Sequence, residues 1–519
     1  MFGFLPRWWV VSWLWMLVWS TAGCSEEGPI TLAAQNDAVA GGDMSTPKDA
    51  LVPLSDGAET VGDVFTDGSD TGLVQDAEVS DVVPEDSAPR MPPGAWRSKL
   101  YPVDWTPQTE DLQGRFLHDF SYAGYKNGEE SPEVFAGAPI FDVMLDFQAT
   151  PGGQDDCTEA VQAAIDAASE AGGGVVYFPG GLYRIDGTLK VESSGVVLRG
   201  AGPDLSRIFF SGAEVSNYSG HLMFSGALNT THEVALVMDA PSRQAWVEVE
   251  SADGFQVGDD VQIGWIVSPD FVEEHEMEYV WNVFNDTWQP FFHRNVVAVD
   301  AQSDPPRLTL DVPLRYRGKT RDGASVRRIE GYLHGVGVED LGMADATDWE
   351  TAWAHTQVHL FRMVGVKDSW VKNLWSFKPP TAPDSGLGKD AHLQNSGLMV
   401  KMSKRVTVAD SRLSFAQNRG SGGCGYLFEV RQSSEILFRD CLGRAGRHNF
   451  IQNWGFGATG IVWLRVHSLE GENIFSKNLD LGLPTTPDFH HSLAAPEGQG
   501  WPHSRYGCAL YRFDPLPAR

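Results

Sequence analysis

The second half of the chain repeats one pattern, in which short apolar runs alternate with charged or small residues, as in VGVEDLGM, VTVADSRLSF and EILFRDCLGR. Runs this short cannot bury an apolar face alone, and repeats of this length are typical of solenoids whose turns stack into one core. The pattern predicts an all-β solenoid, with residues 378–395 as a loop insertion. One position of the repeat aligns five residues, which follow one another at intervals of 28, 42, 30 and 25 residues: Asp340, Asp368, Asp410, Asp440 and Arg465.

A helix is expected just before the strands begin. Asp156 stands at a capping position and Glu159 follows three residues later, which is typical of a helix start. Five apolar residues then follow at helical spacing, and three consecutive glycines end the helix. The stripe consists of Ala160, Val161, Ala164, Ile165 and Ala168.

Two segments resemble a known family. DDCTEAVQAAIDAASEAGGGVVYFPGGLYRI is similar to the opening of the pectate-lyase-like superfamily, and GRHNFIQNWG resembles a segment between turns in one branch of it. The likeness covers roughly residues 98–490. It implies a right-handed parallel β-helix whose N-terminal end is capped by the predicted helix. It implies no single reaction, since the superfamily holds lyases, hydrolases, epimerases and non-catalytic adhesins.

Longer alternating strands, such as AWVEVESADGFQVGDDVQIGW, interrupt the turns and predict a β-rich insertion. The last residues lose the pattern, and a truncated end is weighed there equally with a natural one. The expected parts are a signal peptide at 1–23, an acidic linker at 24–95, a lead-in at 96–139, the start of the β-helix with its cap helix at 140–231, the insertion at 232–330, further β-helix turns at 331–493 and an irregular tail at 494–519.

The N-terminus has the pattern of a targeting segment. Arg7 precedes the apolar run Trp8–Trp19, which would span only about 18 Å as a helix and cannot cross a bilayer core of roughly 30 Å. The following Thr21-Ala22-Gly23-Cys24 resembles a bacterial lipoprotein signal, although Thr21 departs from the usual Leu. The resemblance implies lipidation of Cys24 and anchoring at the outer membrane or cell surface. Ordinary secretion is the alternative.

Charge limits the partners. The chain carries 39 Lys and Arg against 69 Asp and Glu, a net charge of −30, which argues against nucleic-acid binding. Residues 25–95 hold 15 of the acidic side chains with only Lys48 and Arg90, and this predicts a flexible tether. A polysaccharide is the expected partner of the folded part, together with a membrane reached through the lipid anchor.

The candidate catalytic residues lie on consecutive turns beside loop 378–395. A polysaccharide lyase must neutralise a uronate carboxylate and then remove the neighbouring proton. Lys401 or His448 would act as the base and Arg431 with Arg447 would neutralise the carboxylate, assisted by the amides of Gln452 and Asn453. Structural roles for Arg447 and His448 remain the alternative. Ca²⁺ is a possible cofactor if the protein is a lyase, and no metal-ligand motif is assigned.

A glycoside hydrolase needs two facing carboxylates instead. Glu429, Asp410 and Asp440 are the candidates, because aligned residues on adjacent turns lie about 4.8 Å apart. Aspartate at a repeated position is, however, more often a turn residue. A non-catalytic glycan-binding or adhesive surface protein is the rival class.

Aromatic residues crowd the insertion and have two interpretations. As a glycan platform, Trp281 and Trp288 would pack on sugar rings, whereas the alternative is a local core. The cysteines are equally ambiguous. Cys424 and Cys441 would either bridge neighbouring strands or remain buried thiols.

Overall fold

The computed structural model describes residues 100–132, 137–212, 215–275, 287–420, 423–452, 457–471, 489–490 and 509–512. They belong to one compact unit that spans residues 91–519. The predicted signal peptide, Cys24, the acidic linker, Trp281 and Asn453 lie outside the described residues. Among the helices in these ranges, none combines the length and apolar character needed to cross a membrane.

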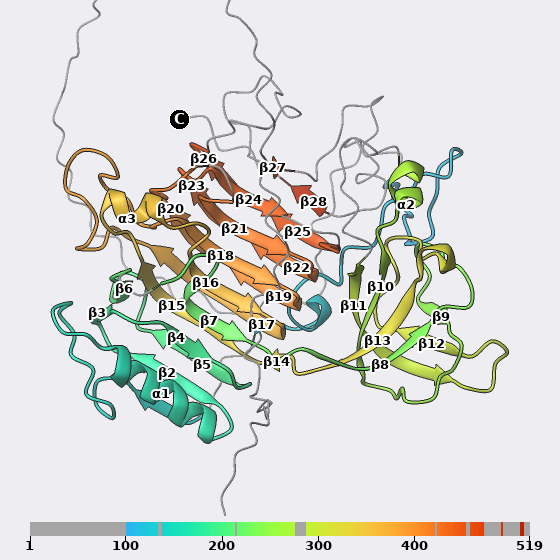
Figure 1. The fold of residues 1–519 in the computed structure, drawn as a ribbon, viewed down its shortest axis with the longest axis horizontal. Helices are drawn as coiled ribbons and strands as arrows, with labels where there is room; N and C mark the ends of the chain where they lie inside the picture. Colours follow the sequence, from blue (N-terminus) through green and yellow to red (C-terminus); the bar gives the residue numbers. More distant parts are fainter. Residues whose placement is uncertain are drawn as a thin grey trace, which may run out of the picture. The chain divides into compact units, whose positions relative to one another are not determined.

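Parallel strands stack in three columns, here called faces A, B and C (Figure 1). Face A consists of β1 (Ile140–Asp142), β2 (Gly174–Phe178), β5 (Val196–Gly200), β15 (Gly337–Ala344), β17 (Val366–Ser376), β19 (Lys404–Ala409), β22 (Ser434–Arg439), β25 (Ile461–Leu464) and β28 (Ala509–Arg512), with β14 (Leu333–His334) beside β17. Face B consists of β4 (Leu189–Val191), β7 (Gly220–Ser225), β16 (His359–Val364), β18 (Ser396–Lys401), β21 (Tyr426–Arg431), β24 (His448–Gln452) and β27 (Phe489–His490). Face C consists of β3 (Gly181–Ile185), β6 (Ser206–Phe210), the ends of β15 and β17, β20 (Arg412–Ser414), β23 (Leu442–Arg444) and β26 (His467–Leu469).

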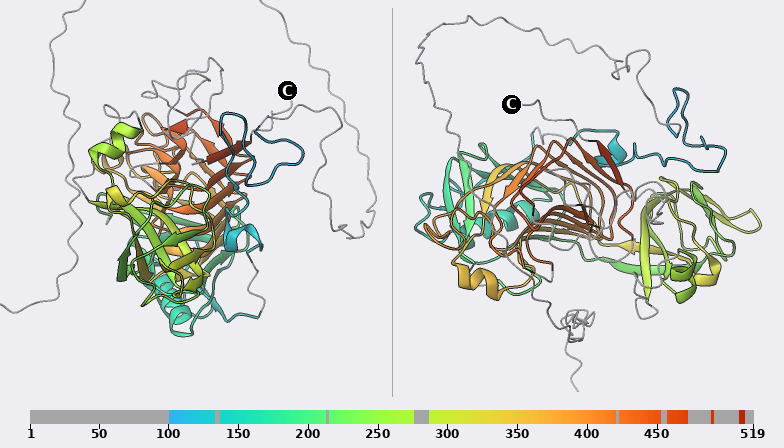
Figure 2. Two further views of the ribbon diagram at one scale, coloured as in Figure 1. Left: turned by 90° about the vertical axis from the view of Figure 1, so that its right-hand side faces the viewer. Right: turned by 90° about the horizontal axis from the view of Figure 1, so that it is seen from above.

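Each turn visits faces B, A and C in that order, as β18, β19 and β20 show before β21 begins the next turn. Viewed along the stack, successive turns superimpose (Figure 2, right). Inward side chains form one continuous core, in which Phe428 and Phe450 stack with ring centroids 5.0 Å apart. The predicted right-handed parallel β-helix, with its capping helix and β-rich insertion, is confirmed.

Helix α1 (Thr158–Glu170) packs against β1, β2 and β4 at the first turns. Asp156 accepts hydrogen bonds from the backbone N–H and the hydroxyl of Thr158, so its carboxylate satisfies a donor of the first helical turn. Four of the five stripe residues are buried, as predicted: Val161, Ala164, Ile165 and Ala168. The other helices are α2 (Pro269–Glu274), α3 (Trp349–Ala354) and the 3₁₀ turns η1 (Tyr125–Gly128) and η2 (Thr320–Asp322).

The repeat alignment was wrong in one turn. Glu339 pairs with Lys372 and Leu341 with Leu374, so Asn373 and not Asp368 occupies the position of Asp340. The corner residues between faces A and C share a positive φ, which Asn and Asp tolerate better than most residues. They are Asp340, Asn373, Asp410, Asp440 and Arg465, with φ between 51° and 55°.

The insertion forms its own antiparallel sheet and its own core. The alternative of a local core is confirmed for three aromatic residues of the insertion, because Trp265, Phe291 and Phe292 are fully buried and Trp265 stacks on Phe291 at 3.8 Å. The strands, in sheet order, are β8 (Asn229–Ala235), β13 (Ser325–Glu330), β10 (Asp260–Ile266), β11 (Trp288–Asp300), β12 (Arg307–Leu310) and β9 (Trp246–Glu248).

Buried ion pairs hold the insertion against face A, and we call this set the insertion network. Asp260 accepts from Lys404 at 2.8 Å, and Glu435 accepts from Arg315 at 2.8 Å. Burial alone would raise the pKa of Asp260, but Lys404 and Lys367 outweigh it and lower that pKa. The network consists of Lys367, Lys404, Arg405, Arg294 and Arg315 with Asp260, Asp311, Asp368 and Glu435.

The described cysteines are thiols. Cys424 and Cys441 are both buried and unbridged, so the disulfide alternative is wrong. The Cys441 thiol donates to the Arg439 carbonyl at 3.2 Å, and burial raises its pKa to about 12. It is therefore protonated and serves as a small apolar side chain.

Candidate functional site

Three of the charged residues predicted for chemistry, Lys401, Glu429 and Arg431, lie together on the outward side of face B, at the ends of β18 and β21. Lys401 pairs in register with Arg431, and Val364 at the end of β16 pairs with Lys401. Neighbouring strands lie about 4.8 Å apart, so the two cationic side chains start within reach of one bound group. We call Lys401, Glu429, Arg431, Arg362 and His359 the face B cluster.

Glu429 is the acidic centre of the cluster and is fully buried. Its Oε2 accepts from Nε2 of His359 at 2.8 Å, and its Oε1 accepts from Nε of Arg431. Burial alone would raise the pKa of Glu429, but Arg431 and His359 lower it to about 2. The carboxylate is therefore ionised at neutral pH and orients both of its partners.

His359 was not predicted as a site residue. It opens β16, is buried, and has a pKa lowered by burial despite the neighbouring carboxylate. At neutral pH a neutral imidazole would donate from Nε2 to Glu429, leaving Nδ1 as an acceptor. Nδ1 is buried and finds no hydrogen-bond partner among the described residues.

Arg362 was also missed, although the segment VHLFRM that contains it was recognised as a strand. It lies across Met399 from Glu429 in the face B register, and its Nη1 donates to the Tyr218 carbonyl at 2.6 Å. Burial, and then the charge of Arg431, lower the pKa of Arg362. Its Nε is buried and makes no hydrogen bond within the described ranges.

Lys401 differs from the other members of the face B cluster because its amine has no hydrogen-bond or ion-pair partner among the described residues. The side chain is half-buried, and it forms neither a hydrogen bond nor an ion pair with any residue that the structure describes. Burial lowers the pKa of Lys401, and Arg431 and Arg362 lower it further. A lysine in such surroundings releases its proton more readily than a free one, as a general base requires.

The cluster as a whole is short of negative charge. Arg362, Lys401 and Arg431 bring three cations, whereas Glu429 is the one carboxylate among them. Buried cations without counter-charge are costly, so an added carboxylate would be favoured here. The donor set does not suit Ca²⁺, which prefers oxygen ligands, and the described residues contain no group of three His, Cys, Asp or Glu placed to hold a metal ion.

The remaining predicted residues lie apart from Lys401. Arg447 donates to the Gly420 carbonyl at 2.7 Å, and His448 packs on the ring of Tyr426 at 5.0 Å. His448 pairs in register with Tyr426, at the opposite end of β21 from Arg431. Gln452 pairs with Val430, next to Arg431. The structure therefore brings Lys401, Glu429 and Arg431 to one end of face B and His448 to the other, whereas Gln452 is in register with the core residue Val430 and so does not join the outward cluster.

Trp288 begins β11 of the insertion and is partly buried. Its Nε1 donates to the Ser325 hydroxyl at 2.9 Å, and the Arg327 guanidinium lies 3.8 Å from its ring centroid. The next residue, Gln289, accepts from Gln432 at 3.3 Å. The insertion thus reaches the corner immediately after Arg431, but the Trp288 ring is already covered on one side.

The carboxylates proposed for hydrolysis have structural roles. Asp410 and Asp440 occupy the corner between faces A and C, and Asp440 accepts from Arg465 at 2.6 Å. Neither belongs to face B, so they do not pair with Glu429. The turn interpretation of these aspartates is the one that the structure supports.

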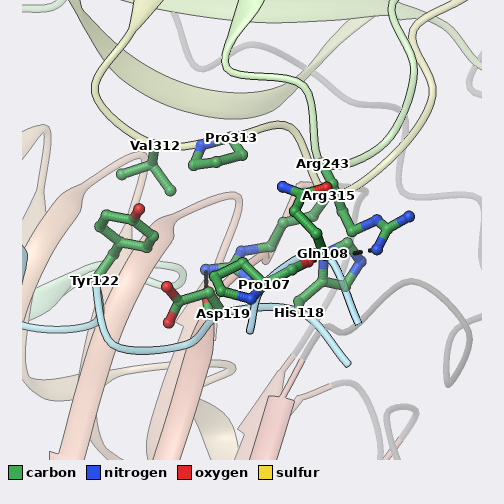
Figure 3. A pocket seen from close by; sticks show the side chains of 9 residues that line it. All are labelled: Pro107, Gln108, His118, Asp119, Tyr122, Arg243, Val312, Pro313 and Arg315. Atoms are coloured by element: carbon green, nitrogen blue, oxygen red, sulfur yellow. Dashed lines mark hydrogen bonds between the residues drawn. The ribbon is translucent and has the colours of Figure 1, made fainter. Parts of the chain in front are cut away.

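A cavity between the lead-in and the insertion is too small for a sugar. It measures about 30 Å³ and is lined by His118, Arg243 and Arg315 among others (Figure 3). A water needs at least roughly 10–15 Å³, so the cavity has room for only about two waters. Burial, then Arg315 and Arg243, lower the pKa of His118 to about 3, and the neutral ring belongs to the packing of the insertion.

Comparison with known proteins gives matches to parts of the chain. A family model described as "Rhamnogalacturonase A/epimerase, pectate lyase-like" matches residues 140–244. Alginate lyase 7 of Azotobacter vinelandii is 48% identical over 66 residues, which are 11% of this chain and 8% of that protein. Mannuronan C5-epimerase AlgE3 of the same organism is 50% identical over 87 residues, 15% of this chain and 5% of that protein. The chain therefore matches only a small part of these relatives.

Among solved structures, two are similar to this chain at low sequence identity. The Pseudomonas phage phi297 tailspike gp61 is 14% identical with a TM-score of 0.46, over 65% of this chain and 53% of that one. An iota-carrageenase complexed to iota-carrageenan fragments is 12% identical with a TM-score of 0.31, over 65% and 52%. The predicted resemblance to the pectate-lyase-like superfamily is confirmed by the family model and by the fold itself.

Proposed function

We propose that this pectate-lyase-like β-helix protein acts on an acidic polysaccharide by removing the proton next to a uronate carboxylate. The observation that carries the proposal is the Lys401 amine. It is half-buried, has a lowered pKa and lies beside two arginines that a substrate carboxylate would neutralise. A general base of this kind contributes roughly 10²- to 10⁴-fold to a rate.

The elimination follows from the positions of these groups. Arg362 and Arg431 would bind the carboxylate, which makes the adjacent carbon more acidic. Lys401 then takes the proton from that carbon, and the electron pair forms a carbon–carbon double bond. The glycosidic carbon–oxygen bond breaks, the leaving oxygen takes a proton from water, and the protonated Lys401 amine returns its proton to the solvent. Glu429 and His359 do not touch the reacting atoms and instead hold Arg431 in place.

Epimerisation is the second candidate, because segments of this chain are about half identical to mannuronan C5-epimerases. The first step would be the same proton removal by Lys401. The proton would then return on the opposite side of the sugar ring, and no glycosidic bond would break. Elimination requires only the base and the cations already described, so it is the simpler reaction for this site.

Hydrolysis has less support from the geometry. A general acid must keep its proton near neutral pH, whereas the pKa of Glu429 is about 2. Both of its oxygens are occupied by His359 and Arg431. A non-catalytic adhesive protein would also bind the polymer, but that role would not explain why the amine of Lys401 has no partner among the described residues and a lowered pKa.

The location forms part of the proposal. The apolar run before Cys24 and the acidic residues 25–95 support a lipid-anchored protein at the outer membrane or cell surface. Labelled fatty acid should enter the wild type and not Cys24→Ala. Equal labelling of both proteins would contradict lipidation.

The activity is tested by incubating the purified protein with alginate and with polygalacturonate in D₂O. Elimination predicts new absorbance near the unsaturated-uronate band together with new reducing ends. Epimerisation predicts deuterium at the carbon next to the carboxylate without chain shortening. New reducing ends without the absorbance would indicate hydrolysis, and polymer binding without any of these changes would support the adhesive rival.

A further inference from the structure

Face C carries a second column of outward residues, well separated in register from the face B cluster. Arg207 pairs with Gly342, Gly342 with Trp375, and Trp375 with Arg412. The column continues through Leu442 and His467. Six successive turns therefore contribute to one line along the stack, and five of them add a side chain, since Gly342 has none. Adjacent turns are about 4.8 Å apart, so Arg207 and Arg412 start roughly 14 Å from each other.

Both arginines of this column lie against aromatic rings. The Arg412 guanidinium is 4.0 Å from the ring centroid of Trp375, and that of Arg207 is 5.3 Å from the ring of Phe377. Gly342 makes room for the second contact, because a Cβ at this position would lie 2.8 Å from Cγ of Arg207. The rings fix the guanidinium planes while leaving their N–H donors unused.

Neither arginine is neutralised. Arg207 and Arg412 are exposed, and neither guanidinium forms a hydrogen bond or an ion pair with another described residue. Arg444 on the same face shows the contrast, since it lies 5.1 Å from the Phe415 ring but also pairs with Glu470 at 2.7 Å. Unpaired arginines are notable in a chain with a net charge of −30.

We propose that face C is a second, non-catalytic binding site for an acidic polysaccharide lying along the stack. Charge complementarity identifies the ligand as anionic, because the donors of Arg207 and Arg412 suit carboxylate or sulfate groups. The exposed part of Trp375 between them offers a flat apolar surface for a sugar ring. A linear polymer repeats its anionic groups along its length, as the column repeats its side chains along the stack.

The site goes beyond the proposed function and does not depend on it. Its residues lie on β6, β17 and β20, whereas the face B cluster lies on β16, β18 and β21. A polymer held on face C would raise the local concentration of substrate near the protein. Binding there would persist even if face B catalysed nothing.

The test is affinity electrophoresis of the full chain in gels that contain alginate or, as a neutral polymer, dextran. The double variant Arg207→Gln/Arg412→Gln removes both free guanidinium groups. Its matched control is Arg115→Gln/Arg307→Gln, which removes two arginines that pair with Asp111 and Glu248, one of them also over a Trp ring. We expect the affinity for alginate to fall at least about tenfold in the double variant and to change little in the control.

Two results would overturn the site. One is an equal affinity of the double variant and the control for alginate, and the other is an equal loss of retardation in dextran and alginate. Arg412→Lys keeps the charge but loses the planar guanidinium. Its affinity for alginate should lie between that of the wild type and that of Arg412→Gln. All of these arginine variants should keep the wild-type melting temperature and the turnover of short uronate oligomers. Lys401→Arg separates the two proposals, since it should stop turnover and leave alginate retardation intact.

Discussion

The insertion network and the face B cluster both contain buried and half-buried charges, but only in the first does every cation have a carboxylate partner. Every cation of the insertion network has a carboxylate within 3.2 Å. In the face B cluster only Arg431 has a carboxylate partner among the described residues, while Arg362 and Lys401 have none. The two regions lie on neighbouring faces of the same turns. Gln432, which follows β21, donates a hydrogen bond to Gln289 of the insertion.

The difference shows how one scaffold separates stability from chemistry. A buried ion pair that is fully satisfied fixes the position of two elements, and breaking it costs several kcal/mol. A buried cation without a partner is unfavourable until an anion arrives, and its pKa shifts in the meantime. We therefore expect changes in the insertion network to affect folding and changes in the face B cluster to affect turnover.

The largest expected effect is on turnover. Lys401→Arg keeps the positive charge but replaces the base with a group that stays protonated, so kcat should fall roughly 10²- to 10⁴-fold. Thermal melting should be unchanged. In the wild type kcat/KM should rise with pH as Lys401 loses its proton, with a midpoint below the ordinary lysine value because burial and Arg431 lower its pKa. A variant that keeps full turnover would show that Lys401 is not the base.

The next effect is on folding. Glu435→Gln leaves Arg294 and Arg315 buried without their carboxylate, and the free energy of unfolding should fall by about 3–5 kcal/mol. Urea denaturation measures the change. Glu470→Gln is the control, because Glu470 and Arg444 are exposed and such pairs contribute about 0–1 kcal/mol. Equal stabilities of the two variants would show that the insertion network does not hold the fold.

A buried carboxyl group outside both regions sharpens the comparison, because it is neutral. Asp345 is fully buried, burial raises its pKa to about 8, and His221 lies 3.4 Å away with its own pKa lowered by burial to about 4. Both groups are thus uncharged between these values. The unfolded Asp345 loses its proton near pH 4 and the folded one near pH 8, so stability should decline as pH rises across this range.

Asp345→Asn resembles the protonated acid and should remove that decline. At pH 8 the variant should be more stable than the wild type by roughly 1–3 kcal/mol, and at pH 4 the two should be similar. Urea denaturation at several pH values gives the comparison. A wild-type stability that does not change between pH 4 and pH 8 would contradict the neutral state of Asp345.

The smallest effect concerns the position of Arg431. Gln357 accepts from Nη2 of Arg431 at 2.9 Å, and Gln357→Ala removes this hydrogen bond without touching Lys401. We expect a loss of about 0.5–1.5 kcal/mol in substrate binding, seen as a several-fold rise in KM with kcat nearly unchanged. An equal fall in kcat would place Gln357 closer to the reacting atoms than the structure does.

The sequence predicted the fold well because the repeat is local. Short apolar runs and small or polar corner residues recur on every turn, and the stripe of α1 lies in one segment. The strand register was harder to predict where one turn contains two polar residues that could both be the corner residue. Asp368 and Asn373 both lie in VKDSWVKNLW, and only strand pairing decides which of them matches Asp340.

The candidate site was predicted in part for the same reason. Lys401, Glu429 and Arg431 lie on turns of similar length, so aligning them brought them together. Arg362 and His359 were missed because residues 378–395 separate their strand from β18 and hide the register. The burial of Trp265 and Phe291 could not be read from the sequence either, because an aromatic cluster has the same pattern in a core and on a surface.

The central claim is that the face B cluster lacks one carboxylate, which the substrate supplies. Calorimetric titration of the Lys401→Arg variant, which should bind without turnover, tests this with a short uronate oligomer and with the same oligomer after reduction of its carboxylates to alcohols. The account predicts binding of the acidic oligomer, a loss of at least about tenfold for the reduced one, and a similar loss when Arg362→Met is added. Equal affinity for the two oligomers would contradict it.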